Sequence, residues 1–248
     1  MDETCGNNLY IVLSPESEDF WINRAGNTKS LRTSDVFHYI EQSEAYSKGA
    51  YGSAIIEILQ RSLEKATTNF PKWTSSLYPN LLAGEYALCG MESPSTICDP
   101  DGVLTKEERE FIQKKLASFE VHTRSDSISA GHGYTIGVAL MRTMEGTPGE
   151  KILDIGEDLL DMWKLDPLCQ KDMLFVVVVD DAYQAVVPND GVDVSSEDII
   201  KFFEIEAETF RYGEVGWALS NILDNTSAWL KNSTNVTHAP KESTKESV

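Results

Sequence analysis

The sequence predicts an α/β fold: a three-layer α/β/α sandwich around a small mixed sheet. The first observation is the run LFVVVV at residues 174–179, which is continuous rather than alternating and is typical of a strand buried on both faces of a sheet. The second is the order of elements around it: helix, strand, helix, strand pair and two helices. That order indicates helices packed on both faces of one sheet.

Each element has its own signal. Thr105 can cap a helix whose apolar residues recur with a period of 3.6. Residues 134–144 form an apolar run between glycine-containing turns, which predicts a strand. A second amphipathic helix covers residues 152–163 and ends before a proline. After the buried strand, residues 183–187 return as its hairpin partner, and two further helices follow at 195–205 and 215–230.

Charge excludes one broad class of partner. Of the 248 residues, 40 are acidic and 21 are basic, which gives a net charge of −19. A nucleic-acid binder needs clustered Lys and Arg, so we expect no nucleic-acid partner. The apolar run at 174–179 is far shorter than the roughly 20 residues that cross a bilayer, and the opening MDETCGNN has no features of a secretory signal.

The chain contains an internal repeat. At an offset of 164 residues, Cys5 falls on Cys169, the strand at 9–13 falls on 173–177, and a glycine-containing helical segment at 49–59 falls on 213–223. Asp35 and Glu41 need a gap of one residue to reach Asp198 and Glu204. The first segment therefore corresponds to the second half of the later unit. The alternative is that it forms an independent small α/β piece.

The repeat predicts a division of the chain. Residues 1–70 are the C-terminal half of a unit, 71–97 a connector, 98–230 a complete unit and 231–248 a polar tail. On this interpretation the chain is truncated at its start, which would also account for the missing signal peptide. The half unit would leave a sheet edge and helix faces uncovered.

Sequons and cysteines indicate an extracellular or luminal glycoprotein. Three N-x-S/T sequons begin at Asn225, Asn232 and Asn235. Cys89 and Cys98 lie close in sequence and are the first choice for a disulfide bond. Cys5 and Cys169 could pair with each other, pair elsewhere or stay free, because connectivity does not follow from sequence.

At this point the chain resembles a known family. The string CDPDGVLT at 98–105, followed by a charged helix, is similar to the opening of the TPM domain, and LFVVVVDDAY at 174–183 resembles that domain's later strand. The spacing from Tyr78-Pro79 through Cys89-Gly90 to Cys98 resembles the animal branch that includes the nematode modulator of levamisole receptors. The resemblance implies a Rossmann-like domain on the extracellular or luminal side of a membrane, held by an anchor that this chain does not contain.

Four carboxylates are the candidate metal ligands. Asp99 and Asp101 precede the first helix of the complete unit, whereas Asp180 and Asp181 follow its buried strand. Ligands collect at the carboxyl ends of strands in such sheets, so these groups could hold one Ca²⁺ or Mg²⁺. The resemblance maps the family's metal-binding aspartates onto Asp99 and onto Asp180 or Asp181. The alternative is that all four are turn and helix-capping residues with no ligand.

Two functions follow from the resemblance. The first is a non-enzymatic domain that modulates or assembles a ligand-gated channel of the nicotinic acetylcholine type, with receptor subunits or other membrane proteins as partners. The second is a divalent-metal-dependent acid phosphatase. The first is preferred because Ala182-Tyr183 replaces the family's phosphate-clamping arginine. No catalytic residue is assigned, and His38, His122, His132 and His238 show no metal-ligand spacing.

Overall fold

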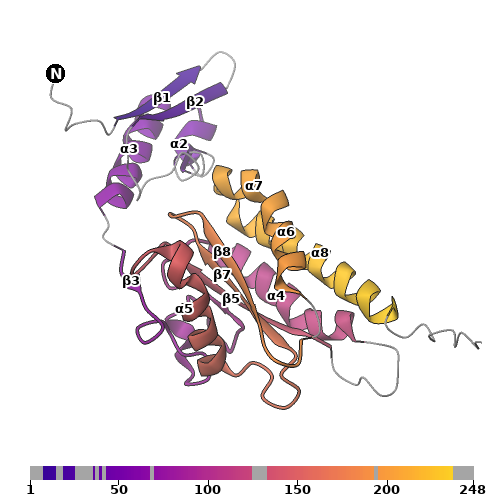
Figure 1. The fold of residues 1–248 in the computed structure, drawn as a ribbon. Helices are drawn as coiled ribbons and strands as arrows, with labels where there is room; N and C mark the ends of the chain where they lie inside the picture. The colour runs from indigo at the N-terminus through magenta and orange to yellow at the C-terminus, as the bar shows by residue number, and fades with distance from the viewer. Residues whose placement is uncertain are drawn as a thin grey trace, which may run out of the picture.

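A computed structural model describes residues 8–14, 19–25, 36, 39–40, 43–67, 70–124, 133–192 and 195–236 (Figure 1). Four residues for which the sequence analysis states expectations lie outside these ranges: Cys5, His38, His132 and His238. None of the helices within the described ranges combines the length and the apolar composition that a membrane crossing requires.

The main sheet has four strands in the order β4-β5-β7-β8. They are β4 (Ile97–Cys98), β5 (Thr135–Met141), β7 (Asp172–Val178) and β8 (Tyr183–Pro188). The first three run parallel, and β8 returns antiparallel to β7. Every residue of β7 is buried. The small mixed sheet predicted from the apolar runs is therefore confirmed.

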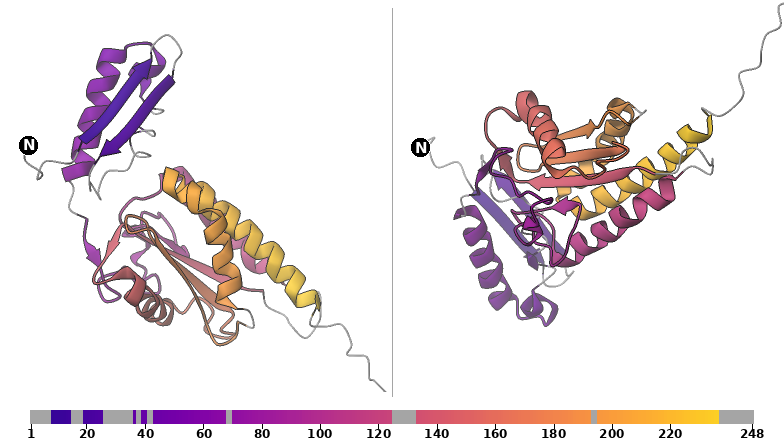
Figure 2. Two further views of the ribbon diagram at one scale, coloured as in Figure 1. Left: turned by 45° about the horizontal axis from the view of Figure 1, so that its top comes forward. Right: turned by 90° about the horizontal axis from the view of Figure 1, so that it is seen from below.

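Helices cover both faces of this sheet, which gives the three predicted layers (Figure 2). They are α4 (Lys106–Thr123), α5 (Pro148–Trp163), α6 (Ser196–Ile205), α7 (Ala207–Tyr212) and α8 (Val215–Val236). Gly156 of α5 packs against Val176 and Val187 on one face. On the other face, the ring of Phe203 in α6 meets that of Phe175 edge to face, with centroids 5.3 Å apart.

Helix α4 has Thr105 as its N-terminal cap, as the sequence predicts, and the structure shows a capping box there. The Thr105 hydroxyl accepts a hydrogen bond from the Glu108 amide at 3.2 Å, and the Glu108 carboxylate accepts one from the Thr105 amide at 2.8 Å. Further along, Lys115 of α4 pairs with Asp224 of α8 at 2.6 Å. The two helices thus lie side by side on the same face of the sheet (Figure 1).

Residues 71–97, expected to form a connector, contribute to the domain. Strand β3 (Lys72–Trp73) pairs in parallel with β6 (Thr143–Met144). Tyr78, Cys89 and Met91 are buried in the same core as the main sheet. The single strand expected over 134–144 is also divided: β5 ends at Met141, and the chain leaves the main sheet to pair with β3.

The first part of the chain has a small core of its own. It contains a hairpin of β1 (Asn8–Ser14) and β2 (Asp19–Ala25), followed by α2 (Glu44–Ser47) and α3 (Tyr51–Thr67). Its core, which is separate from the main one, comprises Val36, Ile40, Ala54 and Ile58. At the other end of the chain, α8 extends to Val236 and so includes the first residues of the expected polar tail.

Candidate functional site

The three parallel strands end at one edge of the main sheet, and a charged residue follows each of them. Asp99 follows β4, Arg142 follows β5, and Asp180 comes two residues after β7. The carboxyl edge of a parallel sheet is where such folds gather polar groups. Arg142 and Asp180 are joined here by an ion pair, and Asp101 is tied to the backbone of Arg142.

Asp99 is a structural acceptor at the start of α4. It is only 2% exposed. Its two carboxylate oxygens accept hydrogen bonds from the amides of Val103 at 2.7 Å and Leu104 at 2.9 Å, and Arg109 adds a contact at 3.1 Å. Burial nevertheless raises the pKa of Asp99 to about 6, because removing the carboxylate from water outweighs these stabilising contacts.

Asp101 joins two elements that are distant in sequence. One of its oxygens accepts hydrogen bonds from the indole nitrogen of Trp73 at 2.9 Å and from the backbone amide of Arg142 at 2.7 Å. The turn before α4 is therefore linked both to β3 and to the end of β5. This carboxylate is placed as an acceptor that fixes the edge of the sheet.

Arg142 is the residue that sequence reasoning missed. Its side chain is 1% exposed and pairs at 3.3 Å with Asp180, which is 2% exposed. The guanidinium also lies over the ring of Phe70, 4.6 Å from the centroid. The family pattern has an arginine after its aspartate pair, whereas here Ala182 follows the pair. Arg142, at the end of the neighbouring strand β5, instead places a guanidinium beside Asp180. An arginine inside the apolar run at 134–144 is the signal that could have identified it.

The cation site that the sequence suggested at the four aspartates stays a prediction. Within the ranges that the structure describes, no three His, Cys, Asp or Glu side chains are grouped so that they could hold a metal ion. Asp99 faces the amides of α4, Asp101 faces Trp73 and the backbone of Arg142, and Asp180 faces the guanidinium. These three accept hydrogen bonds from the protein's own donors, which corresponds to the turn-and-cap alternative.

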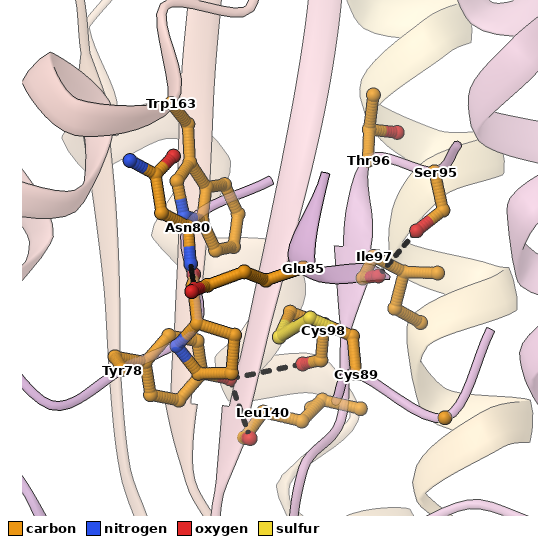
Figure 3. Close-up of a disulfide and its surroundings, with 12 residues drawn as sticks. Tyr78, Asn80, Glu85, Cys89, Ser95, Thr96, Ile97, Cys98, Leu140 and Trp163 are labelled. Carbon is orange, nitrogen blue, oxygen red and sulfur yellow. Dashed lines mark hydrogen bonds between the residues drawn. A yellow bond between two sulfur atoms is a disulfide. The ribbon is translucent and has the colours of Figure 1, made fainter. Parts of the chain in front are cut away.

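A disulfide and a tyrosine reinforce the same edge (Figure 3). Cys89 and Cys98 are bonded, as the sequence predicted, and both are buried. The hydroxyl of Tyr78 lies 2.9 Å from the carbonyl of Cys98 and 2.8 Å from that of Leu140, so it bridges β4 and β5. Burial, followed by the nearby Asp99, raises the pKa of Tyr78 well above its usual value, which keeps the hydroxyl protonated.

The remaining sequence-predicted residues lie elsewhere. Cys169 is a free, partly exposed thiol. Asn225 is exposed on α8 while Thr226 of the same sequon is buried, and Asn232 and Asn235 fall in the last turns of that helix. Glycosylation at these three positions stays a prediction. His122 is exposed near the end of α4.

A surface depression lies at the opposite edge of the sheet. It is bordered by α5, the end of β8 and the start of α6, and its volume is about 540 Å³. Acidic side chains line it, including Glu157, Asp161 and Asp190. It does not include any of the aspartates at the carboxyl edge.

Comparisons with known proteins agree with this architecture. The solution structure of the N-terminal domain of a protein from P. gingivalis has the same fold, with a TM-score of 0.51 at 16% sequence identity, over 66% of this chain and 96% of that one. No curated protein matches the chain. Residues 73–182, which contain β3 to β7 with the disulfide and the charged edge, match the family described as modulator of levamisole receptor-1. Over residues 73–182 the chain is therefore similar to the modulator of levamisole receptor-1 family.

Proposed function

We propose that this chain is a non-enzymatic extracellular or luminal domain of a membrane-associated protein that modulates or assembles a ligand-gated channel of the nicotinic acetylcholine type. The family match over residues 73–182 carries the proposal, because the family's description names modulation of the levamisole receptor. A buried disulfide is compatible with the oxidising side of a membrane.

The chemistry of the charged edge supports a binding role over catalysis. A metal-dependent phosphatase needs carboxylates that are available to a cation and an arginine that is available to phosphate. Here Asp99 is occupied by backbone amides and Arg109, while Arg142 and Asp180 are buried against each other. No observation specifically favours the phosphatase alternative.

The test measures channel currents in the presence of the chain. Cells expressing nicotinic-type subunits sensitive to levamisole receive the purified, disulfide-bonded chain on their outer side. We expect a change in levamisole-evoked current, together with co-purification of subunits with the chain. The control is the Cys89→Ala/Cys98→Ala variant, which has the same charge but lacks the disulfide.

Two results would contradict the proposal. One is unchanged current together with no recovery of subunits, when the chain is shown to be folded by circular dichroism. The other is turnover of a phosphomonoester with Ca²⁺ or Mg²⁺ that is lost in Asp180→Asn, because it would assign the edge to catalysis.

A further inference from the structure

The N-terminal segment reproduces the second half of the main domain in its backbone. Strands β1 and β7 both have seven residues and begin at residues 8 and 172, while α3 and α8 begin at 51 and 215, a shift of 164 residues in each case. The hairpin registers agree as well, because the last pair is Ser14 with Asp19 in one and Val178 with Tyr183 in the other.

The turn before each long helix is also the same. Gly49 and Gly213 both have positive φ, +73° and +83°. Each donates a backbone hydrogen bond of 2.9 Å, to the carbonyl of Tyr46 in the first segment and of Phe210 in the second. A left-handed glycine closes the preceding short helix in both places.

The buried residues correspond one by one. The structure describes four buried residues in the small N-terminal core, and each falls on a buried member of the main core at an offset of 163 or 164 residues. The pairs are Val36 with Ile199, Ile40 with Phe203, Ala54 with Ala218, and Ile58 with Ile222. The packing of these helical residues against one another is thus shared.

One face differs between the two segments. On α8, Ser220 and Leu223 are 4% and 1% exposed. Their counterparts on α3, Ile56 and Leu59, are 60% and 50% exposed. In the main domain, α4 lies against α8 on this side. The first segment keeps large apolar side chains at the positions that a covering helix would bury.

A pair of glycines shows the same difference. A Cβ atom at Gly216 of α8 would come within 2.7 Å of the Glu108 carboxylate of α4, so the covering helix passes close at this point. Gly52 is the counterpart on α3, and a Cβ there would meet nothing within 4 Å. Helix α3 therefore has the small residue that close approach requires but not the approaching helix.

Within the described ranges, the β1–β2 hairpin also lacks a neighbour that its counterpart in the main domain has. Strand β7 is flanked by β5 and β8, whereas β1 is paired only with β2 among the described strands. The elements that cover α8 and β7, namely α4 and β5, follow each other in one stretch, residues 106–141. One helix-and-strand segment would thus cover both open sites at once.

We infer that β1 and α3 form a docking surface for a partner polypeptide that supplies an amphipathic helix followed by a strand parallel to β1. The helix would pack on Gly52, Ile56 and Leu59, as α4 packs on α8. Its apolar stripe would resemble that of α4, whose buried residues Ile112, Leu116 and Phe119 recur at helical spacing. The inference does not depend on the proposed channel partner.

Site-directed crosslinking tests this geometry. The probe is a synthetic peptide of residues 104–124 with Glu108→Cys, and the full chain carries Cys5→Ser and Cys169→Ser so that Cys89–Cys98 is its only disulfide. With Gly52→Cys in the chain, we expect a disulfide-linked adduct with the peptide. Ser53→Cys is the matched control, because its counterpart Trp217 is 62% exposed and faces away from α4.

A second variant tests the apolar face. Ile56→Asp/Leu59→Asp should abolish the adduct at Gly52→Cys, and the main domain should keep its thermal midpoint, because both residues are exposed. Equal adduct at the two cysteine positions, no adduct, or an adduct that survives the double aspartate change would overturn the inference. A chain dimer, seen by light scattering and dissolved by the same changes, would also overturn it, because the occupant would then be a second copy.

Discussion

The buried carboxyl of Asp99 predicts a specific pH dependence. Its pKa is about 6 in the folded chain, against an ordinary value of 3.8 that applies to the unfolded chain. Between these values the folded state binds more protons, so the free energy of unfolding falls as pH rises from about 4 to about 6. A shift of roughly two units corresponds to about 3 kcal/mol.

Asp99→Asn should remove this contribution. The measurement is urea unfolding at several pH values between 5 and 7.5, expressed as wild type minus variant, so that contributions from other acids cancel. We expect this difference to decrease with rising pH and to level off above about pH 7. A flat difference would show that Asp99 has an ordinary pKa. Exposed Asp154 serves as the control position, through Asp154→Asn.

The pair of Arg142 with Asp180 gives a second prediction at this scale. Both side chains are almost fully buried, so Arg142→Met leaves a buried carboxylate without its guanidinium. We expect a loss of about 3 to 5 kcal/mol in the free energy of unfolding. Arg142→Met/Asp180→Leu should lose less than the sum of the two single changes. Strict additivity in this double-mutant cycle would contradict the coupling, and exposed Lys201→Met should change little.

Sequence patterns located some of these residues but not their roles. The nearness of Cys89 and Cys98 was enough to predict the disulfide. Two aspartates were placed correctly after the buried strand and two before the first helix, but the sequence does not show which donors face them. Arg142 was missed because its partner is 38 residues away in sequence and the two meet only when β5 and β7 pair.

At the scale of elements, local signals were sufficient where the periodicity was strong. The continuous apolar run became β7, and the capping box at Thr105 began α4. Expectations failed where tertiary contacts decide where an element ends and with which strand it pairs. The run at 134–144 is divided because residues 143–144 pair with β3 instead of continuing in the main sheet. Helix α7 was also missed, because its six residues are too short for a periodic signal.

The disulfide at the entrance of the domain is the element whose loss should be easiest to measure. It closes a short loop with a sequence separation of 9 residues, and loop-closure entropy predicts about 2 to 3 kcal/mol of stabilisation. Cys89→Ala/Cys98→Ala should therefore lower the thermal midpoint by roughly 5 to 10 °C. Cys169→Ser, which changes a free thiol, should leave it unchanged. Equal midpoints for all three proteins would contradict a stabilising role.

At the scale of the whole molecule, two cores divide the chain. Among the residues whose burial the structure describes, the buried members of the main core run from Tyr78 to Leu230, and those of the small core from Val36 to Ile58. Segment 71–97, which was expected to connect them, belongs to the main core through Tyr78 and Cys89. The physical boundary therefore lies near residue 70 rather than residue 98.

This boundary predicts independent folding of residues 70–236. All strands of the main sheet, both of its helical layers, the disulfide and the Phe70 contact with Arg142 lie within this range. We expect a polypeptide of these residues to unfold in one cooperative transition, with a midpoint within about 3 °C of the main transition of the full chain. The full chain should show a second transition, because the described core of the first segment is separate from the main one.

Scanning calorimetry of both proteins measures these transitions, and near-ultraviolet circular dichroism reports the packing of Trp73 and Trp163. The matched comparison is a polypeptide of residues 98–236, which lacks Cys89, the Tyr78 bridge between β4 and β5, and strand β3. We expect it to lose cooperativity, because the carboxyl edge of the sheet then has neither its disulfide nor its covering strand. If residues 98–236 unfold as cooperatively as residues 70–236, the segment before Cys98 is a connector after all, and the boundary returns to the position that the repeat suggested.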